Sequence, residues 1–236
     1  MNGYWYKTEE GDNNISICHY MRLDHFIQLV ETDKLYATKR MFFAGDANEG
    51  YYDKRFEFAF SIASSNAPPQ TKSTNRMMKF REIVECPVSC WNKREEESYA
   101  MWKAYATELG VCIRTTVKRF VESIMIDDLS INSSDRLICG SMKYIKHPHS
   151  ADELGQMFNK YYGYSDENEY RFYLDLKNGV DYFDDHILVP INSRYMIEEI
   201  LISPFIDKVV ADKFKRMIKC GYGIENVRQS EIKIKK

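Results

Sequence analysis

Hydrophobic residues along the chain follow two periods, one typical of helices and one typical of strands. Phe26, Ile27, Leu29 and Val30 recur at helical spacing and predict an amphipathic helix. The pattern predicts helices at residues 23–32, 52–63, 97–106, 117–125, 151–162 and 207–219. It predicts strands at residues 15–20, 34–38, 82–91, 110–115, 137–145, 167–176, 197–202 and 227–234.

This order of elements is that of an α+β protein rather than a regular βαβ alternation. We therefore expect a mixed or split β-sheet flanked by helices. The sequence has no internal repeat, which favours a single domain over residues 1–236, and the turn-forming residues at 64–75 predict a loop. It also has no glycine-rich phosphate loop, which argues against Rossmann and P-loop enzymes.

Composition narrows the class of protein further. A hydrophobic fraction of 44% with 29% charged residues is ordinary globular usage. The net charge of −2 argues against a nucleic-acid-binding surface over the whole molecule. The six cysteines are dispersed, mostly in apolar runs, and indicate buried thiols in a reducing compartment. No apolar stretch approaches the roughly 20 residues of a membrane helix, so we expect a cytoplasmic protein without a membrane partner.

The most informative segment is the acidic and aromatic run that begins the predicted strand at 167–176. If Glu167, Glu169 and Arg171 alternate along a strand, they share one face, while Tyr170 and Phe172 point the other way. Two neighbouring carboxylates repel each other unless a cation or the hydroxyls of a ligand satisfy them. Such pairs are common in active sites, although a solvated strand edge with a local ion pair explains the pattern too.

A second candidate is an aromatic stripe on the predicted helix at 97–106. Ser98, Met101, Trp102 and Tyr105 share one side of this helix by their spacing. Such a stripe is typical of a packed core. The alternative is a platform on which Trp102 or Tyr105 stacks against a planar ring of a ligand.

Other candidates involve histidine and cysteine. His19, next to Tyr20, suits a site in which one ring nitrogen bonds sugar hydroxyls and the other bonds the backbone; a structural histidine is the alternative. Cys86 and Cys90 with His147 and His149 offer four zinc ligands, but residues 86 and 90 of a strand lie roughly 13 Å apart. Cys90 and Cys112 are candidate nucleophiles, with no neighbour in sequence that marks either thiol as activated.

Several of these segments together resemble an uncharacterised bacterial family, domain of unknown function 2971. The family usually has Asn-Asp-Pro-Phe-Glu where this chain has Gly-Asp-Ala-Asn-Glu at residues 45–49, a departure that affects any role of Asn48 and Glu49. Its members often lie in defence-associated gene neighbourhoods, so the resemblance implies a defence or toxin-like role. The matching segments are Val88-Ser89-Cys90-Trp91, Met101-Trp102-Lys103-Ala104-Tyr105-Ala106, Gly110-Val111-Cys112-Ile113, Glu167-Asn168-Glu169-Tyr170-Arg171 and Glu199-Ile200-Leu201-Ile202-Ser203-Pro204.

The order of His19, Tyr105 and Glu169, with Glu167 completing an E-x-E pair, is similar to that of ADP-ribosyltransferases. This resemblance implies an ADP-ribosyltransferase-like fold and NAD as the substrate. It implies that Glu169 stabilises an oxocarbenium-like ribose and that His19 holds a ribose hydroxyl. Tyr105 would stack on nicotinamide, and Glu167 would orient or deprotonate the acceptor. The remaining nucleotide-binding residues would be Tyr20, Trp102 and Arg171.

Two other functions remain open at this stage. One is a non-catalytic module that senses a nucleotide or metabolite, in which the carboxylates only recognise hydroxyls. The other is a metal-dependent nuclease that uses Glu167, Glu169 and a further acid such as Asp46. The acceptor, which is a protein or a nucleic acid in the transferase hypothesis, leaves no mark in the sequence.

Overall fold

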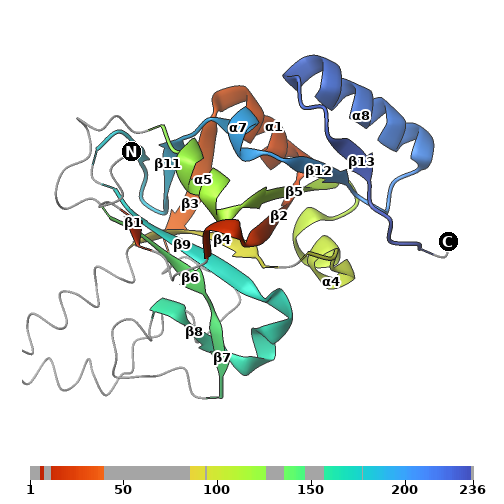
Figure 1. The fold of residues 1–236 in the computed structure, drawn as a ribbon. Helices are drawn as coiled ribbons and strands as arrows, with labels where there is room; N and C mark the ends of the chain where they lie inside the picture. Colours follow the sequence, from red (N-terminus) through yellow and green to blue (C-terminus); the bar gives the residue numbers. More distant parts are fainter. Residues whose placement is uncertain are drawn as a thin grey trace, which may run out of the picture.

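A computed structural model describes residues 6–7, 12–39, 86–93, 95–125, 136–146, 157–176 and 178–234. The described residues form a mixed β-sheet flanked by helices, as the sequence predicts (Figure 1). The predictions for residues 52–63 and 64–75, and for Asp46, Asn48, Glu49, His147 and His149, lie outside the described residues.

The sheet contains strands from both ends of the chain. Its main path runs β1-β6-β9-β4-β2-β5-β12-β13, and β3, β11 and β10 branch from it. The strands are β1 (Tyr6–Lys7), β2 (Ser16–Arg22), β3 (Lys34–Lys39), β4 (Pro87–Asn92), β5 (Gly110–Thr116), β6 (Arg136–Ser141), β9 (Glu169–Asp175), β10 (Asp181–Tyr182), β11 (His186–Pro190), β12 (Glu199–Ile202) and β13 (Val227–Gln229). A separate parallel pair joins β7 (Lys143–Ile145) to β8 (Asn159–Tyr161).

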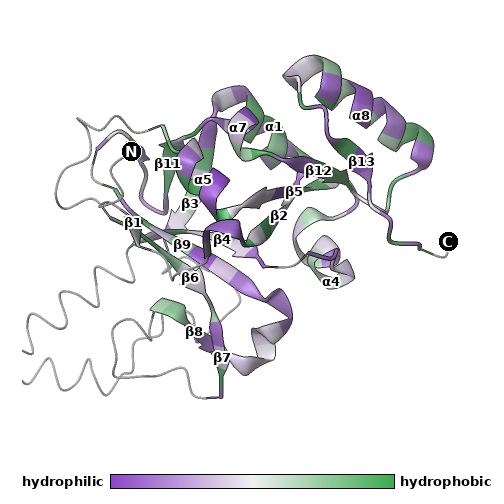
Figure 2. Cartoon of the chain, in the orientation of Figure 1, coloured by the Kyte–Doolittle hydropathy of each residue, from purple (hydrophilic) through white to green (hydrophobic). Residues whose placement is uncertain are grey.

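The helices lie on the two faces of this sheet (Figure 1). They are η1 (Asp12–Asn14), α1 (Leu23–Thr32), α4 (Tyr99–Met101), the π-helix η3 (Trp102–Ala106), α5 (Val117–Ser123), the 3-10 helix η4 (Tyr162–Glu167), α7 (Ser193–Met196) and α8 (Lys208–Tyr222). Helix α1 matches the predicted bounds, and α8 extends the predicted 207–219 by one turn. In Figure 2 the visible side of α8 is largely hydrophilic, while strands β11 and β12 carry hydrophobic residues.

The largest core lies on one face of the sheet. There Trp91, Phe172 and Ile113 pack against Phe26 of α1 and Phe120 of α5. Burial of apolar side chains of this size is the main term that stabilises the fold. A second, smaller cluster on the opposite face contains Tyr20, Cys112, Leu201 and Trp102.

The sheet forks at β4, and this feature positions the candidate site. One edge of β4 pairs with β9 over five residues. On the other edge, Asn92 at one end of β4 pairs with Cys18 of β2, while Val88 and Pro87 at the other end pair with β3. Strands β2 and β3, which α1 joins along the chain, thus pair with opposite ends of β4. The fork therefore leaves the middle of β4 open to a cavity.

Several predicted elements differ from the observed ones. The described part of 151–162 includes strand β8, because parallel pairing with β7 overrides the local helical pattern. Residues 97–106 form a single α-turn followed by a π-helix rather than one α-helix. The predicted strand at 227–234 ends at Gln229, because Ser230 and the amide of Glu231 bond to the Glu97 carboxylate instead.

Candidate functional site

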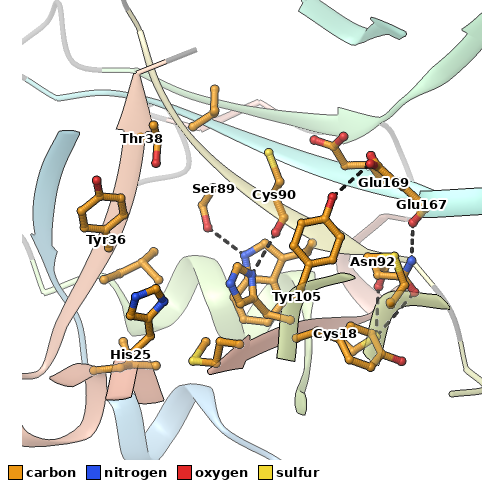
Figure 3. Close-up of a pocket in the computed structure, with 18 of the residues that line it drawn as sticks. Cys18, His25, Tyr36, Thr38, Ser89, Cys90, Asn92, Tyr105, Glu167 and Glu169 are labelled. Atoms are coloured by element: carbon orange, nitrogen blue, oxygen red, sulfur yellow. Dashed lines mark hydrogen bonds between the residues drawn. The ribbon is translucent and has the colours of Figure 1, made fainter. Parts of the chain in front are cut away.

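A cavity of about 930 Å³ occupies the fork between β2, β3 and β4. Residues of α1, α4, the π-helix, β8, η4, β9 and β11 complete its wall. Figure 3 shows Tyr36 and Thr38 of β3 at one end of the cavity and Tyr105, Glu167 and Glu169 at the other. The two ends have different chemistry.

The acidic end is an ionic cluster built on Lys160. The Lys160 Nζ lies 2.5 Å from Glu167 Oε2 and 3.2 Å from Glu169 Oε2. Arg171 binds the same Glu169 carboxylate through Nε at 2.6 Å and Nη2 at 3.1 Å. Two cations and two carboxylates therefore balance each other at the wall of the cavity, which removes the repulsion expected of a bare acidic pair.

The two carboxylates differ in exposure and in charge environment. The Glu169 side chain is 5% exposed, whereas that of Glu167 is 19% exposed. Burial alone would raise the pKa of Glu169, but Arg171 and then Lys160 outweigh this effect and lower the pKa to about 2. Glu169 is thus ionised and fully engaged by cations, while Glu167 is the more accessible of the two carboxylates.

The backbone turn at Asn168 separates the two glutamates. Glu167 ends η4, Asn168 adopts a left-handed conformation with φ 42° and ψ 53°, and β9 begins only at Glu169. The prediction that Glu167, Glu169 and Arg171 share one face of a strand was therefore wrong for Glu167. Asparagine tolerates this conformation better than most residues, which explains why the strand pattern breaks here.

Two asparagines fasten this turn to the end of β4. The Asn92 side-chain amide donates to the Glu167 carbonyl, and the Asn168 side-chain amide donates to the Lys93 carbonyl. The Lys93 amide in turn donates to the Asn168 carbonyl at 2.7 Å. These bonds hold Glu167 at the rim of the fork, independently of the ladder between β4 and β9.

Tyr105 reaches the acidic end from the π-helix. Its hydroxyl donates to Glu167 Oε1 at 3.0 Å. Burial, followed by the neighbouring Glu167 carboxylate, raises the pKa of Tyr105, so the hydroxyl stays protonated and remains a donor. A π-turn is a common device for aiming a side chain at a functional site.

The backbone around the π-helix is strained and tightly packed. The helix closes with a bond from the Thr107 amide to the Trp102 carbonyl, and Thr107 adopts a φ of 57°, which is unusual for a β-branched residue. A Cβ added to Gly110 would lie 2.1 Å from the Ala106 carbonyl oxygen, so only glycine fits there. This arrangement fixes the position from which Tyr105 projects.

Trp102 and Tyr20 have supporting positions around the same helix. Trp102 is fully buried, meets Tyr20 edge-on at 5.1 Å and donates from its indole nitrogen to Glu97 at 3.1 Å. Its ring is part of the core rather than of the cavity lining. Tyr20 does line the cavity, and its hydroxyl accepts the Ser98 amide at 2.9 Å at the start of α4.

His19 lies on the floor of the fork. Its Nδ1 is 2.9 Å from the Cys90 carbonyl oxygen, and its ring lies 5.1 Å from that of Trp91. A carbonyl only accepts, so Nδ1 carries the proton and Nε2 is the acceptor nitrogen. Burial is the main cause that lowers the pKa of His19 to about 4, so the ring is neutral near pH 7.

Of the predicted site residues, the fork brings together His19, Tyr20, Tyr105, Glu167 and Glu169 along one cavity. Arg171 lies behind Glu169 with no exposed surface and also donates to the Tyr173 hydroxyl at 3.2 Å. The sequence interpretation missed Lys160, Tyr164 and Asn92, which also line the cavity. The signal that could have pointed to Lys160 is the pair of neighbouring carboxylates, because two such groups need a further cation besides Arg171.

The cysteine and zinc hypotheses gain no support from the described residues. Burial raises the pKa of the Cys112 thiol well above its usual value, which disfavours it as a nucleophile. Cys90 lines the cavity, but its strand neighbour Arg171 is committed to Glu169. In the described ranges, no group of three or more His, Cys, Asp and Glu side chains lies close enough to hold a metal ion.

Comparison of the chain with protein-family models, curated proteins and solved structures gives no match. Any function must therefore be inferred from the site itself. Across the parts of the chain that the structure describes, no helix combines the length and apolar character needed to cross a membrane.

Proposed function

We propose that the fork cavity binds NAD and that the protein is an ADP-ribosyltransferase-like enzyme. The observation that carries the proposal is the Glu167 carboxylate at the cavity wall, held by Tyr105 and Lys160 while part of its surface stays accessible. A carboxylate fixed in a partly dehydrated cavity stabilises developing positive charge better than one in water.

The size and lining of the cavity suit a ligand of this class. Its volume of about 930 Å³ lies within the range of roughly 300–1,000 Å³ typical of small-molecule sites. Aromatic side chains line both ends, and polar or charged side chains such as His25, Asn92 and Lys160 occur along the cavity between apolar ones. A split sheet with a ligand between its branches is also consistent with the ADP-ribosyltransferase-like fold that the sequence resemblance implies.

The proposed reaction breaks the bond between the ribose C1′ and the nicotinamide nitrogen. The bonding electrons leave with nicotinamide, which departs as a neutral molecule, and the ribose becomes oxocarbenium-like. Glu167 binds a ribose hydroxyl and stabilises this positive charge, and His19 Nε2 accepts a hydrogen bond from another ribose hydroxyl as a second anchor. A lone pair of the acceptor then forms the new bond to C1′, and the proton lost by the acceptor passes to Glu167 and on to water.

This assignment exchanges the roles that the sequence suggests for the two glutamates. A carboxylate offers about four acceptor positions, and Glu169 already accepts three bonds from Arg171 and Lys160. Glu167 accepts two, from Tyr105 and Lys160. We therefore assign the contact with the substrate to Glu167. Glu169 is a positioning residue that holds Lys160.

One observation favours a second candidate, a non-catalytic module that senses the same nucleotide. Both carboxylates already have cationic partners. Such fixed carboxylates suit the recognition of ligand hydroxyls as well as they suit catalysis. The motif resemblance to the uncharacterised bacterial family fits either candidate, with a defence or toxin-like role and a protein or nucleic acid as the acceptor of the enzyme.

The test combines calorimetric titration with NAD and mass-spectrometric detection of nicotinamide released in the presence of cell lysate. We expect the wild-type protein to bind NAD and release nicotinamide. The Glu167→Gln variant should bind NAD within a few-fold of the wild type but lose about 100-fold or more of its release rate, because the charge acts mainly on the transition state.

A matched control is Glu225→Gln, since the Glu225 side chain is 82% exposed and paired only at the surface with Lys219. It should leave binding and release unchanged. Binding without release in the wild type would identify the sensor instead. The absence of both NAD binding and nicotinamide release would refute the NAD hypothesis. Cleavage of nucleic acid that needs a metal ion and stops on addition of a chelator would support the nuclease.

A further inference from the structure

Three aromatic rings form a continuous stack beside the fork. The His186 ring lies 4.2 Å from the Tyr36 ring at an interplanar angle of 22°, and 4.4 Å from the Phe183 ring at 5°. Two nearly parallel neighbours at such distances lie on opposite faces of the His186 ring. Phe183 and Tyr36 are therefore the two ends of the stack.

The register of the strands shows where the stack points. Tyr36 of β3 pairs with Leu188 of β11, so His186 is its diagonal neighbour on the same face of the sheet. Strand β11 lies on one side of β3, and the fork lies on the other. Because the rings follow one another from β11 to β3, the outer face of Tyr36 is turned toward the fork. Tyr36 lines the cavity and is 46% exposed (Figure 3).

Hydrogen bonds at His186 and Phe183 fix the stack at the end away from the open face of Tyr36. The His186 Nδ1 bonds to Asp185 Oδ1 at 2.6 Å, which fixes the middle ring at its edge. The Phe183 amide donates to the His186 carbonyl at 2.9 Å, and the Lys39 ammonium donates to the Phe183 carbonyl, also at 2.9 Å. A stack fixed in this way offers the open Tyr36 ring as a preorganised surface, which lowers the entropy cost of binding a planar group.

We propose that the Tyr36 end of the cavity is a stacking subsite for a purine base. The base would be the fourth ring of the stack, and the side chains of Thr38 and His25, which line the cavity beside Tyr36, provide hydrogen-bonding groups for its edge (Figure 3). This inference rests on the proposed function for its orientation: the ribose that is cleaved lies at Glu167, so the adenine end of NAD lies at Tyr36.

The test uses AMP, which carries the base but not the scissile bond. We expect AMP to bind the wild-type protein and Tyr36→Ala to weaken this binding by about 5-fold to 150-fold, the range measured when one base loses an aromatic partner. Tyr36→Phe keeps the ring and should bind AMP within about twofold of the wild type. Tyr182→Ala is the matched control, because Tyr182 is 51% exposed on the neighbouring strand β10 and is not among the described residues that line the cavity.

Equal AMP affinity of the wild type and Tyr36→Ala would overturn the subsite, as would the absence of AMP binding to the wild type. Nicotinamide release distinguishes this failure from that of the proposed function. If the protein releases nicotinamide from NAD but Tyr36→Ala binds AMP as tightly as the wild type, only the subsite is refuted. AMP binding lost in Tyr36→Ala, with no release from NAD, would support the subsite and refute the transferase.

Discussion

The two ends of the fork cavity are built in opposite ways. At the acidic end, Lys160, Glu169 and Arg171 are nearly buried and linked by short ionic hydrogen bonds. At the aromatic end, Tyr36 and Phe183 are about half exposed and stack on either side of the His186 ring. The acidic end is thus part of the folded core, while the aromatic end is a surface feature supported by one turn.

This contrast indicates how the two ends tolerate change. A buried charge that loses its partner remains buried and unsatisfied, so one substitution at the acidic end affects the whole fold. A half-exposed ring that is removed is replaced by water at little cost. Ligand affinity at the aromatic end is therefore separable from stability, whereas at the acidic end only Glu167 is accessible enough to separate the two.

The largest effect is expected for Arg171→Leu. This change leaves the Glu169 carboxylate without its main cation, and we expect the free energy of unfolding to fall by about 3–5 kcal/mol. Urea denaturation measures the loss. The control Arg22→Leu removes a surface pair with Asp24 whose side chains are 58% and 57% exposed, and should cost less than about 1 kcal/mol. Similar losses in the two variants would contradict the contrast.

Acid sensitivity at the floor of the fork comes next in size. The folded pKa of His19 is about 4 against an ordinary value of 6.5, so the unfolded chain binds more protons than the folded chain between these pH values. Stability is present above pH 6.5 and falls as the pH decreases toward 4, by about 2 kcal/mol between pH 7 and pH 5. Urea denaturation at both pH values should show this loss in the wild type and a smaller one in His19→Gln.

The contribution of Glu169 to stability changes in a lower pH range than that of His19, so it does not obscure the effect of His19. Its folded pKa of about 2 lies below the ordinary value of 4.5, so its contribution is present above pH 4.5 and lost only below that. A wild-type protein whose stability is unchanged between pH 7 and pH 5 would show that His19 is not buried as described.

The smallest effect on stability is expected at the aromatic end. Tyr36→Ala removes a ring that is 46% exposed, and we expect the free energy of unfolding to change by less than about 1 kcal/mol. The same urea measurement tests this value. A loss above about 2 kcal/mol would mean that the stack supports the fold, which would remove the distinction between the two ends.

The sequence predicted elements well where hydrophobic period and local propensity agree. Helix α1, with Phe26 and Leu29 on its buried side, is an example, and the strand at Gly110–Thr116 is another. Prediction failed where tertiary contacts decide the local structure. The pairing of β8 with β7 and the left-handed Asn168 depend on partners that are distant in the sequence or on a single backbone angle.

The candidate site follows the same rule. The sequence indicated Glu167, Glu169, Tyr105 and His19, because unusual residue types stand out in a strand or helix pattern. It gave no indication that Tyr36 and His186 stack beside them, because β3 and β11 are separated by more than 140 residues along the chain. The sequence also did not show which cation binds which carboxylate. In the folded chain Lys160 contacts both glutamates, whereas Arg171 contacts Glu169.

The most direct test of the account is a crystal structure of the protein with ADP-ribose. We predict that the sugar lies in the fork with a ribose hydroxyl at hydrogen-bonding distance from Glu167, about 2.5–3.0 Å, and with adenine parallel to the Tyr36 ring. ADP-ribose bound outside the fork, or bound within it with its ribose away from Glu167, would contradict the account.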